Sequence, residues 1–196
     1  MKMRNVKRWL SSLLCVAMLF STLSVFGAVP KAKAVSTYDG EAGAAWGRAN
    51  YKGKYNYSCA TFASQCLNAG GFTDVYDAGC TSLRRKLLAT GVFVEYPLEV
   101  TKQKIYPHSS ANNGKVSVGD VLLVHKRGSS TYVHAYVAET VNDGPLYVVQ
   151  TSLGDVYGSR HCWFDYNGNT TDYEIVSMHY TGTVSYTHLT LPTNRE

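Results

Sequence analysis

The chain has 196 residues, 45% of them apolar, with 19 Lys and Arg against 14 Asp and Glu, a formal net charge of +5. The excess of positive charge comes from residues 1–34, which hold six of the basic residues and none of the acidic ones. With Arg195 and Glu196 also set aside, 12 basic and 13 acidic residues remain. The remaining part of the chain is therefore near neutral, and it has no basic run interleaved with aromatic residues. This is not typical of nucleic-acid-binding proteins, and we expect no nucleic-acid partner.

Residues 1–34 have the pattern of a secretory signal. Four basic residues lie among the first eight, an apolar run extends from Trp9 to Val29, and Ala32 and Ala34 are small residues that suit cleavage after Ala34. We therefore expect a secreted protein without membrane contact after cleavage, an uncleaved membrane anchor being the alternative. No other segment approaches the roughly 20 apolar residues of a spanning helix.

Three helices are predicted next along the chain. The first covers 41–50, which is Ala-rich, and the third covers 81–90. The second begins near Ser58, a residue suited to the N-cap, and ends at Gly70-Gly71. From Cys59 onward its apolar residues recur at i, i+3, i+4, i+7 and i+8, which is one face of a helix.

The second half of the chain reads as strands. They are expected at 121–125, 131–140, 145–152, 163–166 and 173–179, with Asn142-Asp143-Gly144 as a hairpin turn. Helices followed by an antiparallel sheet predict an α+β domain, with N-terminal helices packed on a central antiparallel sheet. Residues 35–183, about 149 in number, suit a single domain with one core.

The last residues differ in character from the rest. Val184 to Thr193 can be back-translated into a DNA string that resembles the transposase adapter used in short-read sequencing libraries. We therefore expect residues 184–196 to be an assembly artefact, a natural Thr-rich tail being the alternative.

Cys59 is the candidate nucleophile. The first turn of a helix offers free N–H groups and the positive end of the macrodipole, which stabilise a thiolate and an oxyanion. A histidine on a strand far downstream is the expected partner of such a cysteine. The alternative is that Cys59, like Cys66, is a core residue or belongs to a disulfide, and the residues by themselves leave both open.

The stretch Ser58 to Phe72, SCATFASQCLNAGGF, resembles the start of the amidase domain of secreted Gram-positive proteins. That domain is related to the NlpC/P60 and CHAP cysteine hydrolases of the papain-like clan. The later VGDVLLVH and YVHAYVAE, at 118–125 and 132–139, resemble the family's Gly-Asp turn and the strand that opens with its histidine. The resemblance extends over about 38–180 and implies a papain-like, NlpC/P60-type fold.

Carried over to this chain, the resemblance makes Cys59 the nucleophile and His134 the general base. Gln150, on the following strand, is the expected third member, which would orient the imidazole. The family often has His, Asn or Asp at the third position, and Asn or Asp before the cysteine where this chain has Ser58.

The implied activity is that of a cysteine amidase or peptidase without a cofactor or metal. Its expected substrate is peptidoglycan or a peptide, cut in the stem peptide or at the N-acetylmuramoyl–L-alanine amide by a wall-associated, monomeric protein of a Gram-positive type bacterium. A non-catalytic wall-binding module on the same scaffold and a transglutaminase-like acyl transferase are the alternatives.

The remaining histidines and cysteines receive plainer interpretations. His125 is expected to be exposed, or else to replace His134 as the base, and His108 and His179 are expected at the surface. His161, beside Cys162, has no metal-binding spacing. The cysteines Cys66, Cys80 and Cys162 leave several disulfide pairings open, Cys80 with Cys162 among them.

Overall fold

The structure is a computed structural model, and it describes residues 37–52, 57–73, 75–151, 158–162, 164 and 172–182. The expected signal at 1–34 and the expected artefact at 184–196 lie outside these residues, so both stay predictions. Of the strand expected at 163–166 only Phe164 is described, and it is not in a strand. Within the described part of the chain, no helix is long and apolar enough to cross a membrane.

Three helices form close to their predicted positions: α2 (Gly40–Asn50), α3 (Cys59–Ala69) and α4 (Cys80–Ala89). Capping side chains explain two of the starts. Asp39 caps α2, and Ser58 accepts a hydrogen bond from the N–H of Thr61 in α3. As predicted, α3 ends at its glycines, with Gly70 as the C-cap and Gly71 at a φ of +88°, which glycine adopts without steric cost. Cys59 is thereby the first helical residue of α3.

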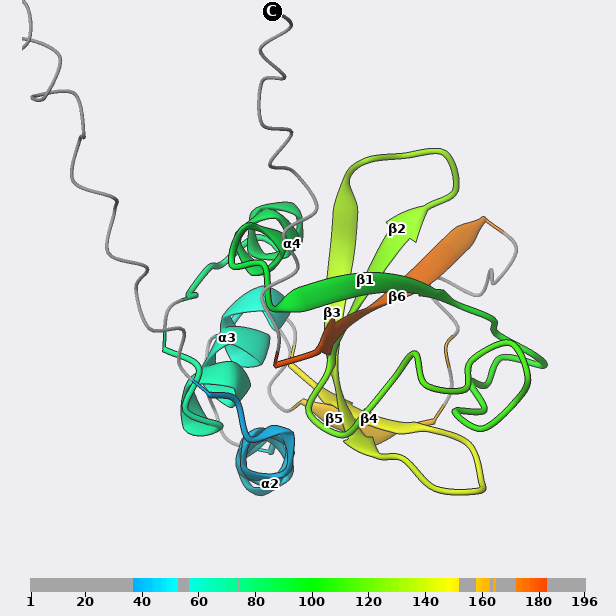
Figure 1. The fold of residues 1–196 in the computed structure, drawn as a ribbon, viewed down its shortest axis with the longest axis horizontal. Coiled ribbons are helices and arrows are strands. Elements are labelled where there is room, and N and C mark those ends of the chain that lie inside the picture. Colours follow the sequence, from blue (N-terminus) through cyan, green and yellow to red (C-terminus); the bar gives the residue numbers. More distant parts are fainter. Residues whose placement is uncertain are drawn as a thin grey trace, which may run out of the picture. The chain divides into compact units, whose positions relative to one another are not determined.

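The described strands are β1 (Phe93–Leu98), β2 (Val121–Lys126), β3 (Tyr132–Thr140), β4 (Tyr147–Gln150), β5 (Ser159–His161) and β6 (Tyr173–Tyr180). They form one antiparallel sheet in the order β1-β6-β2-β3-β4-β5, shown in Figure 1. The predicted α+β class, with N-terminal helices on an antiparallel sheet, is confirmed.

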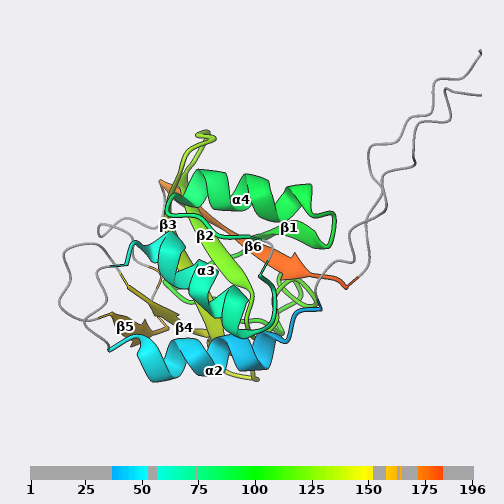
Figure 2. The ribbon, with the colours of Figure 1, turned by 90° about the vertical axis from the view of Figure 1, so that its left-hand side faces the viewer.

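The three helices lie side by side on one face of the sheet (Figures 1 and 2). All of them contact β3, α2 and α3 also contact β4, and α4 contacts β1. The core between helices and sheet is closed by fully buried side chains such as Phe62 on α3, Leu83 on α4 and Met178 on β6. This packing brings the N-terminal ends of α3 and α4 close to β3, the strand that carries His134.

A second apolar cluster lies on the other face of the sheet, because successive side chains of a strand alternate between faces. Val137 of β3 packs in the helix-side cluster, whereas its neighbour Tyr136 packs in the second cluster with Ile105, from the segment between β1 and β2. His134, two residues before Tyr136, has its ring 4.6 Å from the Tyr136 ring, centroid to centroid. By this alternation the side chain of His134 lies on the same face of β3 as that of Tyr136.

Two strands were not predicted. The segment of β1 shows no regular alternation of apolar and polar residues and contains Pro97, which argues against a strand inside a sheet. β1 is the edge strand, where a proline that donates no hydrogen bond is tolerated. β5 has three residues and is the opposite edge, and so short a segment carries no periodicity to detect.

Candidate active site

Cys59 is held at the N-terminal end of α3 by the cap before it. The Ser58 hydroxyl lies 3.1 Å from the backbone nitrogen of Thr61 and 2.8 Å from the carbonyl oxygen of Ala78, so it ties the start of α3 to the segment that leads into α4. The backbone N–H of Cys59 belongs to the first turn, where the helix itself supplies no carbonyl acceptor. The position combines a thiol with the positive end of a helix dipole.

The structure brings His134 and Gln150 together across β3 and β4. Val137 pairs with Val149, and this register places His134 and Gln150 on the same face, displaced diagonally. His134 Nε2 is hydrogen-bonded to Gln150 Oε1. Because a carbonyl oxygen only accepts, Nε2 carries a proton, which leaves Nδ1 as the nitrogen that can exchange a proton with a thiol.

The surroundings of Cys59 favour the thiolate. A hydrogen bond from Cys80 is the largest cause, and the hydrogen bond and charge of His134 and a bond from the backbone of Ala135 act in the same direction. Burial of the partly exposed thiol opposes them, and together they lower the pKa of Cys59 to about 4. The sequence-predicted residues Cys59, His134 and Gln150 thus form one chain of polar contacts, and their catalytic roles stay predictions.

Cys80 is the site residue that the sequence did not predict. Its sulfur lies 3.5 Å from that of Cys59, and the hydrogen bond between them is the largest cause that raises the pKa of Cys80. Cys80 therefore stays a neutral thiol that donates to the Cys59 thiolate. The suggested pairing of Cys80 with Cys162 is wrong, since both are free thiols and Cys80 faces Cys59 instead.

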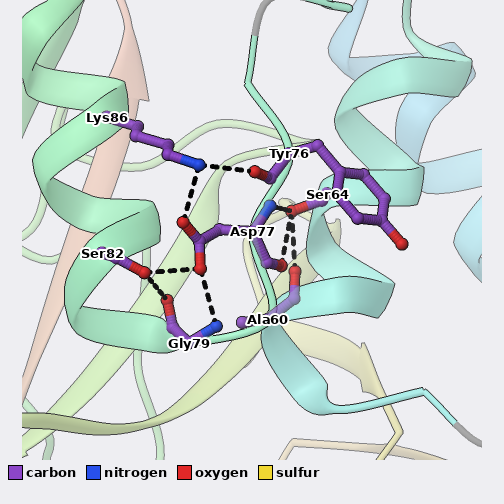
Figure 3. A network of polar contacts seen from close by, with 7 residues as sticks. All are labelled: Ala60, Ser64, Tyr76, Asp77, Gly79, Ser82 and Lys86. Atoms are coloured by element: carbon purple, nitrogen blue, oxygen red, sulfur yellow. Dashed lines mark hydrogen bonds and ion pairs between the residues drawn. The ribbon is translucent and has the colours of Figure 1, made fainter.

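A network around Asp77 fixes the start of α4, and hence Cys80 (Figure 3). The Asp77 carboxylate accepts hydrogen bonds from the Gly79 N–H and the Ser82 hydroxyl and pairs with Lys86 at 2.8 Å. Its backbone N–H donates to Ser64 Oγ of α3 at 3.1 Å. Because Gly79, the N-cap of α4, has no side chain to cap the helix, Asp77 performs that role from two residues earlier and joins α4 to α3.

Two histidines differ from their predicted exposure. The side chain of His125 is only 13% exposed, with Nδ1 at 2.9 Å from the carbonyl of Ser129. His179, expected at the surface, is 20% exposed and lies 2.9 Å from Asp120, which raises the pKa of His179 although burial lowers it. Asp120 belongs to the Gly-Asp turn, whose glycine has a φ of +86°, so this motif anchors β6.

The remaining two histidines in the described part of the chain are His108, in a loop, and His161, on β5. His108 is exposed, as predicted. His161 of β5 lies 3.3 Å from the amide nitrogen of Gln150, a contact that could not be predicted from the sequence because β5 is too short to show a pattern. Among the described residues, no three His, Cys, Asp or Glu side chains group in a way that could hold a metal ion.

A cavity of about 500 Å³ opens over β1, β6 and the end of β2. Glu95, His125, Arg127, Tyr132 and Glu174 line it, together with apolar residues of β1 and β6. None of the three predicted site residues lines this cavity. Of its charged groups, Glu95 pairs with Arg84 and Glu174 pairs with Arg127. The cavity is therefore not assigned to the substrate.

Comparison with known proteins adds little to this geometry. No protein-family model matches the chain, and no curated protein matches it in sequence. Among solved structures it is similar to a chain of the type VI native effector–immunity complex Tae3–Tai3 from Ralstonia pickettii, with a TM-score of 0.42 and 14% identity. The match covers 72% of this chain and 100% of that chain. A likeness this distant carries no functional argument, so the function is inferred from the site.

Proposed function

We propose that the protein is a secreted cysteine hydrolase that cleaves an amide bond in peptidoglycan. The observation that carries this proposal is the joining of a low-pKa Cys59 at a helix N-terminus to His134 and Gln150. A thiolate, an imidazole oriented by a carbonyl acceptor and N–H groups at a helix end are the parts that thiol-dependent acyl transfer needs. The substrate class rests on the resemblance of the Ser58–Phe72 stretch to the secreted amidases.

The chemistry follows from these positions. The Cys59 thiolate attacks the amide carbon, and the oxygen that becomes negative is stabilised by N–H groups of the first turn of α3, including that of Cys59. The His134 imidazolium gives a proton to the leaving amine as the C–N bond breaks and a thioester forms. His134 then takes a proton from water, the hydroxide attacks the thioester, and the acid and the Cys59 thiolate are released.

Gln150 holds the imidazole through this cycle. Its carbonyl accepts the Nε2–H of His134 in both protonation states, so the ring keeps Nδ1 toward the sulfur. The Asn of papain-like proteases belongs to the same kind of constellation, which is recognised by geometry and not by residue identity.

Digestion of purified peptidoglycan tests the proposal, with Cys59→Ala and His134→Ala as the inactive controls. New chain ends identified by mass spectrometry distinguish a stem-peptide cut from a cut at the N-acetylmuramoyl–L-alanine amide. Release of products by the wild-type protein and loss in both variants is the expected result. Binding to the wall without any products would favour the non-catalytic module, and products formed only with an added amine would favour an acyl transferase.

A further inference from the structure

The Gln150 side chain has two chemically different ends, and only one of them suits His134. With the carbonyl toward Nε2–H, the amide accepts a hydrogen bond from the imidazole. Turned by 180°, it would place its NH₂ against that N–H, and two donors would face each other. The activity proposed above, on which this inference rests, therefore depends on what holds the amide in its present orientation.

Strand β5 supplies two partners for the other end of the amide. The Gln150 nitrogen lies 2.9 Å from Ser159 Oγ and 3.3 Å from His161 Nε2. Gln150 is directly opposite Ser159 in the β4–β5 register and Val148 is opposite His161, so His161 meets Gln150 diagonally on the same face. The two N–H donors of the amide thus each have an acceptor within hydrogen-bond distance.

His161 is itself held in place. Its ring contacts Tyr136 edge-on, with centroids 5.6 Å apart, and Phe164 at 6.4 Å. The neighbouring Arg160 anchors β5 by a 2.8 Å hydrogen bond from Nε to the buried Glu139 of β3. An edge strand of three residues is in this way fixed against the strands that carry His134 and Gln150.

We propose that His161, with Ser159, is a positioning residue that orients the Gln150 amide and through it the imidazole of His134. Ser159 and His161 differ in how strongly they restrict the orientation of the Gln150 amide. A hydroxyl both donates and accepts, so Ser159 would suit either orientation of the amide. His161 with an unprotonated Nε2 only accepts, so it selects the orientation in which the Gln150 nitrogen faces β5 and the carbonyl faces His134.

Alkylation of Cys59 by iodoacetamide as a function of pH reports the thiolate without any substrate. His161→Phe keeps an aromatic ring against Tyr136 and Phe164 but removes the acceptor. We expect the alkylation midpoint of Cys59 to rise by roughly one pH unit, and peptidoglycan hydrolysis to fall about tenfold, because a hydrogen bond to the charged imidazolium is weakened.

Gln150→Glu provides the background that separates orientation from packing. A carboxylate has two oxygens, so turning it over changes nothing, and His161 has no orientation left to select. In this background His161→Phe is expected to leave the midpoint of Cys59 unchanged relative to Gln150→Glu alone. An equal shift in both backgrounds would show that the ring acts through packing, and no shift in either would overturn the proposal directly.

The wild-type protein offers a measurement that depends on no variant. ¹⁵N chemical shifts of its histidines are expected to show His161 protonated on Nδ1 and unprotonated on Nε2, and an Nε2–H tautomer would contradict the proposal. The experiments also separate the two claims. Absence of peptidoglycan hydrolysis by the wild type would reject the proposed function, whereas the dependence of the Cys59 midpoint on His161 tests the positioning role by itself.

Discussion

The thiol of Cys80 is expected to set a large share of the acidity of Cys59. Its sulfur is 3.5 Å from that of Cys59, and its hydrogen bond is the first cause of the low pKa, ahead of His134. Cys80→Ala removes the donor, whereas Cys80→Ser keeps a donor of similar size on the same carbon. The two variants therefore differ in the hydrogen bond and little else.

The size of the effect can be worked out from this contact. A hydrogen bond to a charged group contributes about 1.5–3 kcal/mol and one pKa unit corresponds to about 1.36 kcal/mol, so Cys80→Ala should raise the pKa of Cys59 by roughly one to two units. From a pKa of about 4 the midpoint would move to roughly 5–6. Cys80→Ser should stay within about half a unit of the wild type, since its hydroxyl still donates.

Thiolate absorbance near 240 nm and the rate of iodoacetamide alkylation, both followed from acidic to alkaline pH, measure this midpoint. At pH 5 the wild-type thiol is expected to be mostly ionised, whereas the Cys80→Ala thiol should be at least half protonated and react more slowly. A midpoint that remains at the wild-type value in Cys80→Ala would refute the reasoning, because His134 and the N-terminal end of α3 would then be sufficient to lower the pKa of Cys59. An equal rise in both variants would assign the effect to packing and not to the donor.

Three further results are expected. Asp77→Ala should lower the free energy of unfolding in urea by about 1–3 kcal/mol, because the start of α4 loses its acceptor, and an unchanged value would contradict that role. The pKa of His179 is raised beside Asp120, so this histidine stabilises the folded protein below the unfolded pKa of about 6.5, and its contribution is lost as pH rises through the folded pKa. Urea titrations at several pH values should show that this pH dependence of the free energy of unfolding disappears in His179→Asn. A low-molecular-weight disulfide should oxidise Cys59 and Cys80 to a Cys59–Cys80 disulfide, while the reagent takes up their two hydrogens and is reduced to two thiols. Peptide mapping detects this bond, and two separate mixed disulfides would contradict the proximity of the two sulfurs.

The helices and most strands follow from local signals in the sequence. Ser58 as a cap, the apolar spacing after Cys59 and the glycines at 70–71 act within one or two turns, so they mark α3 and place Cys59 at its start without knowledge of the rest of the chain. Once the family resemblance had assigned His134 as the base, the position of Gln150 on the next strand allowed the His134–Gln150 contact to be predicted, because hairpin neighbours pair locally.

The tertiary structure decided the contacts that join separate elements. Cys80 lies 21 positions from Cys59 and reaches it only because α4 docks beside α3 on the same sheet. His161 meets Gln150 through the register of a three-residue edge strand, and Asp120 meets His179 from 59 positions away. The sequence by itself determined where the helices begin and where four of the six described strands lie, since caps, turns and apolar spacing depend on near neighbours. Which side chains tune the thiol and orient the amide depended on strand order and helix docking, which arise from burial of the whole core.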